Sequence, residues 1–311
     1  MTKLSVIISA SNCGHTIERA IRSILGKNKS DIECIVVVNN STDKTSRIAH
    51  KLLDEFQGLV VIDSSAKNVS DARNAGLNKA TGDVIGFCDG DDYFVGGTLD
   101  YFLDEFISSG ANIIACGFFR VDTEGRIIST HELGGGMKRA NAVRCDLLSN
   151  PSLMGSVWNK LYAREVIKDI RFDTNLTYCE DTDFNLRVMK QDGLSVFYSE
   201  SILYNYVQNP DSASNSVNRV FDNTGKLKYL YAMEKVREEY AGNGRMHRET
   251  GLKMATLCID NYDDSLPDDI RNKLVDVIRK NYKYLVLYSY KYEPEENLRR
   301  LRKGLRILSG F

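Results

Sequence analysis

Three aspartates within four residues are the most chemically distinctive feature of the chain. Asp89, Asp91 and Asp92 follow directly on the apolar run at 84–87. Like charges at this spacing repel one another unless a cation lies among them. Carboxylate oxygens suit Mg²⁺ or Mn²⁺, which bind through one or two carboxylates and take other ligands from substrate phosphates. Taken alone, the motif also fits a solvated acidic turn before a helix near Thr98.

A second acidic pair, Glu180 and Asp181, opens an apparent helix at 179–184. Acidic side chains favour the first turn of a helix, so a capping role explains the pair without any chemistry. A carboxylate held at a helix start can also take a proton from an attacking hydroxyl. The two roles are compatible, because the helix start would orient the carboxylate.

The first 120 residues alternate between strand-like and helical periodicity, which predicts the elements that position these carboxylates. Short β-branched runs predict strands, and apolar residues at helical spacing predict the helices between them. We therefore expect an α/β fold with a mainly parallel sheet covered by helices on both faces. Ligands bind such sheets beyond the carboxyl ends of the strands. The expected strands are 4–8, 32–38, 59–62, 84–88 and 112–118, the helices begin at Thr16, Asp43, Asp71 and Leu99, and the loops are 9–14, 39–43, 67–74 and 89–92.

Beyond residue 120 the alternation stops. A turn at 122–125 predicts a hairpin, a glycine triplet follows at 134–136, and mixed segments continue to Ser216. The remainder is helical in pattern, with helices expected at 226–240, 251–261, 267–284 and 295–308. We therefore predict a nucleotide-sugar-binding and catalytic domain at 1–216 and a helical C-terminal region at 217–311.

Several segments, taken together, resemble family 2 glycosyltransferases. They occur in that family's order and spacing over about residues 3–215, and their joint occurrence is more specific than any one of them. The resemblance implies a GT-A (Rossmann-like) fold and transfer of a sugar from a nucleoside-diphosphate-sugar donor, with inversion at the anomeric carbon. The segments are LSVII at 4–8, IVVVNNSTD at 35–43, ARNAG at 72–76, ATGD at 80–83, DGDD at 89–92, WNKLY at 158–162 and ED at 180–181.

The resemblance also implies roles for individual residues. Asp91 would be the metal ligand of the DxD motif, with Asp89 near the ribose and the Mn²⁺ or Mg²⁺. Arg73 would contact the nucleotide, Asp43 would support the loop after the second strand, and Asp181 would be the catalytic base. The chemistry asks for the same groups, because the leaving diphosphate needs its charge neutralised and the acceptor hydroxyl must lose a proton.

On the acceptor side we expect Glu180 together with Trp158, Asn159 and Lys160. Trp158 is the only tryptophan of the chain. It could belong to the core, but an aromatic ring beside an amide and an ammonium group also suits stacking on a sugar ring.

The nucleotide-binding loops depart from the family at two positions. Ser11 stands where the family commonly has an aromatic residue, while Val38 and Asn39 stand where it commonly has two aspartates. The second of those aspartates would accept the N3–H of uracil. The amide of Asn39 can accept or donate a hydrogen bond, so it permits a UDP-sugar without requiring one. With Ser9 these residues form the predicted donor site, and they do not decide which nucleotide base the donor carries.

Charge and composition narrow the class of partner. The 41 basic and 42 acidic residues nearly balance, so we expect no nucleic-acid partner. The N-terminal apolar run is too short for a signal peptide, which predicts a cytosolic protein. The seven cysteines are scattered and form no CxxC pair, which indicates reduced thiols and no zinc site.

The C-terminal helix at 295–308 has an apolar stripe between basic faces. Such a helix can lie on the inner face of an anionic membrane, as a lipid-linked acceptor in polysaccharide biosynthesis would favour, or it can pack on neighbouring helices. The stripe is Leu298, Leu301, Leu305 and Leu308, and the basic residues are Arg299, Arg300, Arg302, Lys303 and Arg306.

Two other functions remain open. A nucleotidyltransferase also joins an α/β sheet to acidic metal ligands, but its phosphate loop is normally rich in glycine and basic residues. Residues 9–15 contain one glycine and neither lysine nor arginine, which counts against it. A non-catalytic module that binds nucleotide or carbohydrate is the alternative outside enzymes.

Overall fold

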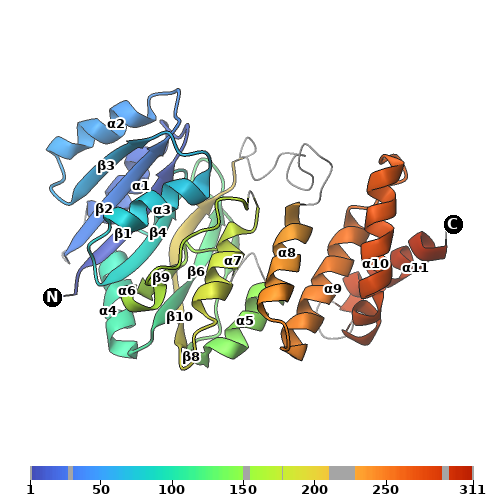
Figure 1. Cartoon of the computed structure of the whole chain (residues 1–311). Coiled ribbons are helices and arrows are strands. Elements are labelled where there is room, and N and C mark those ends of the chain that lie inside the picture. The colour runs from blue at the N-terminus through green and yellow to red at the C-terminus, as the bar shows by residue number, and fades with distance from the viewer. Residues whose placement is uncertain are drawn as a thin grey trace. The chain divides into compact units, whose positions relative to one another are not determined.

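The computed structural model describes residues 2–26, 31–149, 155–176, 178–209, 228–288 and 294–309 (Figure 1). The chain divides into two compact units. One comprises Met1–Val143 and Ser152–Ser212, and the other Arg144–Pro151 and Ala213–Phe311. The domain boundary that we predict, between 216 and 217, lies outside the described residues.

The described strands of the first unit form one sheet with a parallel half and a mixed half. The parallel half has the order β3-β2-β1-β4, and its β-branched residues are buried on both faces, as in β2. These four strands are β1 (Leu4–Ala10), β2 (Ile32–Asn39), β3 (Leu59–Ser64) and β4 (Val84–Asp89), and each pairs in parallel with its neighbour. The predicted strands and their parallel order are confirmed.

The mixed half continues the sheet beyond β4. Strand β9 pairs antiparallel with both β4 and β6, whereas β10 runs parallel to β6 and antiparallel to the short β5. Two further strands, β7 and β8, pair antiparallel with β6 and β10, and the predicted hairpin joins β6 to β7. The strands are β5 (Tyr93–Phe94), β6 (Ile113–Val121), β7 (Ile127–His131), β8 (Gly136–Arg139), β9 (Lys160–Ala163) and β10 (Ser195–Val207).

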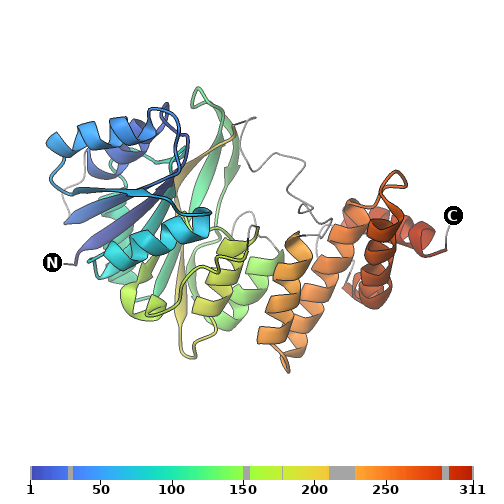
Figure 2. The ribbon, with the colours of Figure 1, turned by 45° about the horizontal axis from the view of Figure 1, so that its top comes forward.

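Helices cover both faces of the parallel half, as Figure 2 shows. Alternate residues of β1 separate the faces: Leu4, Val6 and Ile8 join the core beneath α1, α2 and α4. Ile7 points to the opposite face, where α3 approaches so closely that a Cβ at Gly76 would lie 2.3 Å from Ile7 Cγ2. The helices of this unit are α1 (Ile17–Leu25), α2 (Thr45–Lys51), α3 (Val69–Lys79), α4 (Leu99–Ser109), α6 (Arg164–Ile167) and α7 (Glu180–Val188), and α5 (Ala140–Ser149) spans the division between the units.

Two helix starts differ from the sequence prediction. Thr16 stands at the N-cap position of α1, but its hydroxyl donates to the carbonyls of Cys13 and Gly90 and caps no N–H. It thereby ties the helix to the acidic turn after β4. Helix α3 begins at Val69, because the side chain of Asn68 accepts the N–H of Asp71.

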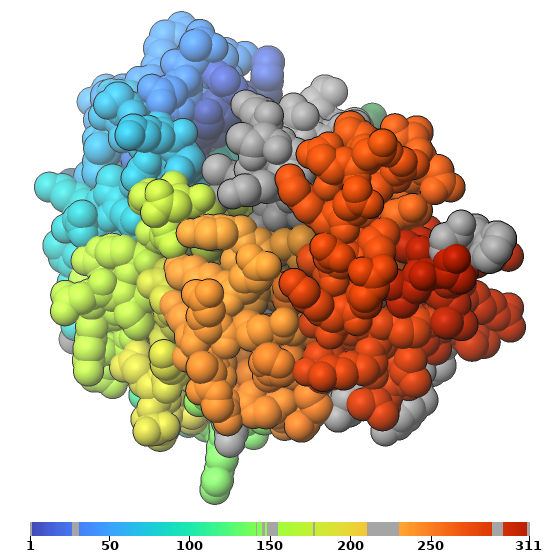
Figure 3. Space-filling model, turned by 45° about the vertical axis from the view of Figure 1, so that its right-hand side comes forward, coloured from blue at the N-terminus to red at the C-terminus, as the bar shows by residue number. Residues whose placement is uncertain are grey.

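The second unit is helical, as predicted, and Figure 3 shows the surface of its helices in orange and red. Its core unites α9, α10 and α11 through Ile259, Ile278, Leu301 and neighbouring residues. Helix α9 starts at Gly244, where Asn243 caps it, and not at Gly251 as expected. Among the described helices, none is long and apolar enough to cross a membrane. The helices are α8 (Lys228–Glu239), α9 (Gly244–Asp260), α10 (Asp268–Tyr288) and α11 (Pro294–Ser309).

Candidate functional site

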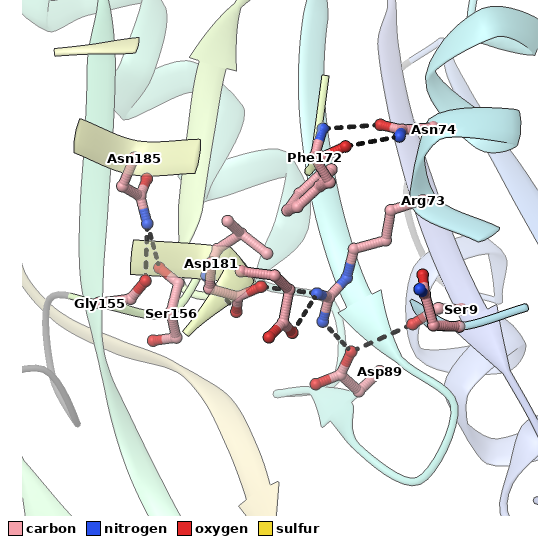
Figure 4. A network of polar contacts seen from close by, with 12 residues as sticks. Ser9, Arg73, Asn74, Asp89, Gly155, Ser156, Phe172, Asp181 and Asn185 are labelled. Carbon is pink, nitrogen blue, oxygen red and sulfur yellow. Dashed lines mark hydrogen bonds and ion pairs between the residues drawn. The ribbon is translucent and has the colours of Figure 1, made fainter. Parts of the chain in front are cut away.

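One arginine lies at the centre of the polar network beyond the carboxyl ends of β1 and β4 (Figure 4). Arg73 on α3 donates from Nη2 to Asp89 Oδ1 at 2.9 Å, and Asp89 is the last residue of β4. Its Nη1 donates to Asp181 Oδ1 at 2.6 Å and to Glu180 Oε1 at 3.1 Å, at the start of α7. A single guanidinium therefore joins the two acidic motifs, which are about ninety residues apart in sequence.

The guanidinium of Arg73 is deeply buried, with 5% of its side chain exposed. Its Cζ lies 5.3 Å from the ring centroid of Phe172, which packs beneath it. Burial alone would lower the pKa of Arg73, but the charges of Asp181, Asp89 and Glu180 outweigh burial and raise it. The family resemblance implies that Arg73 contacts the nucleotide, and that role stays a prediction; in this structure its donors bind three carboxylates.

Asp181 accepts hydrogen bonds from two separate segments of the network. It lies in the first turn of α7, and its Oδ2 accepts the N–H of Val157 at 3.2 Å. Burial raises the pKa of Asp181 to about 7, Arg73 opposes that rise, and the charges of Glu180 and Asp89 add to it. A carboxyl with a pKa near neutrality can both take and release a proton at physiological pH.

The three aspartates after β4 have different environments. Asp92 is 1% exposed, and it accepts the N–H of Val207 at 2.7 Å and the hydroxyl of Tyr204 at 3.0 Å, so it anchors the end of β10. Asp89 faces the network, where Ser9 Oγ also donates to it at 3.3 Å. Burial and the charge of Asp89 raise the pKa of Asp91 to about 6.

Asp89 and Asp91 are the two aspartates of this turn whose side chains are not fully buried. No Lys, Arg or His in the described ranges forms an ion pair with Asp91, and its pKa is raised mainly by burial and further by the negative charge of Asp89, which a cation would relieve. Nor do three or more His, Cys, Asp or Glu side chains converge as a closed metal cluster anywhere in that part of the chain. Two carboxylates with open positions are the set that Mg²⁺ or Mn²⁺ takes when substrate phosphates supply the other ligands.

The two loops that follow β1 and β2 are joined by hydrogen bonds. Asn12 Oδ1 accepts the N–H of Thr42, and Asp43 Oδ2 accepts the N–H of Gly14, both at 2.9 Å. Asp43 also accepts the N–H of Thr45 at 2.9 Å and so starts α2. The carboxylate of Asp43 is thereby occupied in holding the loops, whereas Ser11 is exposed.

Asn39 lies at the end of β2, beside these loops. Its Nδ2 donates to the carbonyl of Asn68 at 3.4 Å. Its Oδ1 is buried, and no described residue donates a hydrogen bond to it. Because the bond to Asn68 fixes which amide atom is oxygen, the free atom of Asn39 is an acceptor.

Three of the four residues expected on the acceptor side have buried side chains, so they are not surface groups. Trp158 is 6% exposed and stacks on Tyr204 at 4.6 Å and on Tyr206 at 5.6 Å, so its ring belongs to the core. Asn159 and Lys160 are fully buried. Within the predicted acceptor set, Glu180 alone has a partly exposed side chain, at 17%.

Sequence reasoning missed the residues that support this network. Phe172 packs under Arg73, Tyr204 links Asp92 to the N–H of Asp89, and Asn185 binds the carbonyls of Gly155 and Ser156. Each contact spans many residues of sequence, so local periodicity carried no signal for it. The pairing of β10 with β5 and β6 is what brings Tyr204 to the acidic turn.

Comparisons with known proteins agree with this geometry. A family model described as glycosyl transferase family 2 matches residues 5–171, more than half of the 311 residues. The uncharacterised glycosyltransferase EpsJ of Bacillus subtilis (strain 168) is 29% identical over 222 residues. That match covers 67% of this chain and 62% of EpsJ, so it spans less than two thirds of the relative's length.

Solved structures share the fold at low sequence identity. S. aureus TarS 1–349 in complex with UDP-GlcNAc aligns with a TM-score of 0.70 and 16% identity, over 99% of this chain and 92% of that one. The mannosyltransferase PcManGT from Pyrobaculum calidifontis, in complex with GDP-Man and Mn²⁺, aligns with a TM-score of 0.58 and 12% identity, over 99% and 86%. These alignments show a GT-A fold.

Proposed function

The chain belongs to glycosyltransferase family 2, and from this premise we propose that it transfers a sugar from a nucleoside-diphosphate-sugar to a hydroxyl of a glycan or lipid-linked acceptor. We further propose inversion at the anomeric carbon and a role in polysaccharide biosynthesis. The observation that carries the proposal is Arg73, which joins the donor-side Asp89 to the candidate base Asp181.

The reaction would use Asp181 as its general base. The acceptor oxygen attacks the anomeric carbon from the face opposite the diphosphate, and its proton passes to the carboxylate of Asp181. The bond between the anomeric carbon and the diphosphate oxygen breaks, and the nucleoside diphosphate leaves with the electron pair. The hydrogen bonds from Arg73 and Val157 hold the carboxylate in position and leave further lone pairs for the proton.

Asp89 and Asp91 would hold the Mn²⁺ or Mg²⁺ of the reaction. When bound, such an ion neutralises charge that develops on the leaving diphosphate. In this proposal Asp89 would bind both the cation and Arg73, from which it accepts a hydrogen bond. The structure of PcManGT with Mn²⁺ supports a metal-dependent donor site in proteins of this fold.

For the donor base we propose that the free Oδ1 of Asn39 accepts a hydrogen bond, as the N3–H of uracil would supply. The complex of TarS with UDP-GlcNAc supports a UDP-sugar, while PcManGT holds GDP-Man. A UDP-sugar is therefore the first donor to test.

One experiment separates this function from its rivals. The protein is incubated with a panel of UDP-, GDP-, CDP- and TDP-sugars and Mn²⁺, and free nucleoside diphosphate is detected. A glycosyltransferase is expected to hydrolyse its own donor slowly without an acceptor. A nucleotidyltransferase would act on nucleoside triphosphates instead, and a non-catalytic module would release nothing, so either result would reject the proposal.

We also propose that α11 contacts an anionic membrane surface. Only part of the apolar stripe of α11 is exposed: Leu301 and Leu308 pack into the helical core, whereas Leu298 and Leu305 are 50% and 59% exposed. These two leucines share the exposed side of α11 with Arg302, Lys303 and Arg306, for which no ion pair occurs within the described ranges. Exposed leucines next to unpaired cations are the chemistry of an interfacial helix.

Vesicle binding tests this surface. Replacing Arg302 and Arg306 by Gln is expected to weaken binding to phosphatidylglycerol vesicles about 30-fold, from about 1 kcal/mol for each cation. The matched control is the replacement of Arg279 and Lys280 on α10 by Gln, which should change little. Equal loss in both variants, or no binding by the wild type, would reject the contact.

A further inference from the structure

The turn at 155–157 carries the backbone group that holds the candidate base. Val157 points its N–H at Asp181 Oδ2, 3.2 Å away, while the carbonyls of Gly155 and Ser156 face the interior (Figure 4). The position of the Asp181 carboxylate therefore depends on whatever fixes those two carbonyls.

Asn185 fixes them from the same helix that carries the base. Its Nδ2 donates to the carbonyl of Gly155 at 2.8 Å and to that of Ser156 at 3.2 Å. Its Oδ1 accepts the hydroxyl of Tyr162 at 2.7 Å, which sets the amide orientation. Asn185 lies one helical turn after Asp181 on α7. Helix α7 therefore holds the turn at 155–157 through Asn185, and that turn holds Asp181 through the N–H of Val157.

Lys160 holds the same turn from β9. Its Nζ donates to the carbonyl of Ser156 at 2.6 Å and to Asn159 Oδ1 at 2.7 Å. The side chain is completely buried, and no carboxylate of the described residues forms an ion pair with it. Burial lowers the pKa of Lys160 to about 7, and the negative charge of Asp181 opposes that shift.

A lysine is an unfavourable residue for this position if packing is its only role. Removing an ammonium group from water costs several kcal/mol, and two neutral oxygens repay only part of that cost. A methionine of similar length would fill the same space without that cost. The two hydrogen bonds of the lysine are therefore what the position uses, because a methionine could make neither of them.

We propose that Lys160 and Asn185 position Asp181 by fixing the turn at 155–157, whose Val157 N–H binds the carboxylate. The inference rests on the proposed function, since it gives Asp181 the role of base. The charged and titratable groups that act on Asp181 are Arg73 from α3, Asp89 from β4, Glu180 from α7, and Lys160 and Tyr162 from β9.

The test compares Lys160→Met with the wild type in two measurements. The first is the titration of the Asp181 carboxyl, followed by the ¹³C signal that Asp181→Asn removes. Loss of the Lys160 contact frees the turn, and with it the Val157 N–H that lowers the pKa of Asp181, so the apparent pKa of Asp181 is expected to rise by about one unit. The second is donor turnover, where kcat at pH 7 should fall about 10-fold and KM for the donor should stay within about two-fold, because the donor-side contacts are unchanged.

Two further variants separate positioning from a general loss of structure. Lys160→Arg keeps a donor for the Ser156 carbonyl and should restore most of the wild-type titration. Asn112→Leu removes another amide that binds backbone, at Ser195 and remote from Asp181, and should leave the titration unchanged. Asn185→Leu frees the turn and should lower kcat without weakening donor binding.

The outcomes are distinguishable. An Asp181 titration that is the same in Lys160→Met and the wild type would overturn the inference, and so would an equal shift in Asn112→Leu. If the wild type releases no nucleoside diphosphate from any donor, the proposed function fails, while a shifted Asp181 titration would still support positioning by Lys160.

Discussion

Replacing Asp181 by Asn should lower activity and raise stability at the same time. The carboxylate accepts two hydrogen bonds on different oxygens, from Arg73 on Oδ1 and from the N–H of Val157 on Oδ2, and the single amide oxygen of Asn can keep one of them. What the variant loses is the group that takes the proton. We expect kcat to fall by about two to four orders of magnitude, the usual contribution of a general base, with donor affinity almost unchanged.

The gain in stability follows from the raised pKa of Asp181. An ordinary Asp has a pKa of 3.8, and burial raises the folded-state value to about 7. The folded state therefore binds the proton more tightly than the unfolded chain, so this group costs stability as the pH rises from about 4 through 7. The difference in pKa corresponds to at most about 4 kcal/mol above pH 7. The neutral amide of Asn avoids this cost, as expected where a residue that activity requires lowers the stability of the fold.

Chemical denaturation at two pH values checks this reasoning. At pH 8 Asp181→Asn should have the higher free energy of unfolding, and at pH 4.5 the difference between variant and wild type should largely vanish. Turnover is measured on the same samples as release of nucleoside diphosphate. A variant less stable than the wild type at pH 8 would show that the ion pair with Arg73 outweighs burial, and near-normal kcat would assign the proton to Glu180 or another group.

Three further predictions address the donor site and the fold. Asp91→Asn should nearly abolish Mn²⁺-dependent donor binding with the fold intact, and calorimetry showing unchanged donor affinity would contradict the metal assignment. Asn39→Asp should preserve or tighten UDP binding, by up to about 1 kcal/mol, in titrations with UDP, GDP, CDP and TDP; loss of a wild-type UDP preference would show that Asn39 does not face the base. Burial would raise the pKa of Glu33, but hydrogen bonds from Ser5, Thr81 and Lys3 lower it to about 2. Glu33→Gln should therefore cost about 3 kcal/mol of stability at pH 7, measured in urea, and a cost that persists at pH 2 would reject the charge-based explanation.

The parallel half of the fold was predictable because its information is local. β-branched runs and helical spacing over 4–118 identify the strands and helices within a few residues, since the apolar pattern of each element follows from its own periodicity and burial. The ends were harder to place. Strand β6 continues to Val121 because β7 and β10 pair with it on both sides, and α9 starts at Gly244 because Asn243 caps it. Pairing partners and caps extend an element beyond the span that periodicity marks.

The site was predictable only in part, for a related reason. The spacing of Asp89, Asp91 and Asp181 within known motifs identified the acidic groups, but no pattern specified what surrounds each one. Trp158 is an example, because the sequence pattern of a tryptophan next to polar residues does not distinguish a ring that contacts a sugar from a ring in the core. Its stacking on Tyr204 decides between the two, and that contact depends on the crossover to β10.

Arg73 shows why the chemistry of the site depends on the tertiary fold. A lysine ammonium has one centre of charge, whereas the planar guanidinium presents separate N–H groups, and here Nη2 serves Asp89 while Nη1 serves Asp181 and Glu180. Three elements, α3, β4 and α7, are thus held by one side chain, and Phe172 fixes its plane. Binding of a cation or a diphosphate at Asp89 would change the charge that Arg73 shares with Asp181. Through this one buried group, occupation of the proposed donor site can alter the basicity of Asp181, the proposed base.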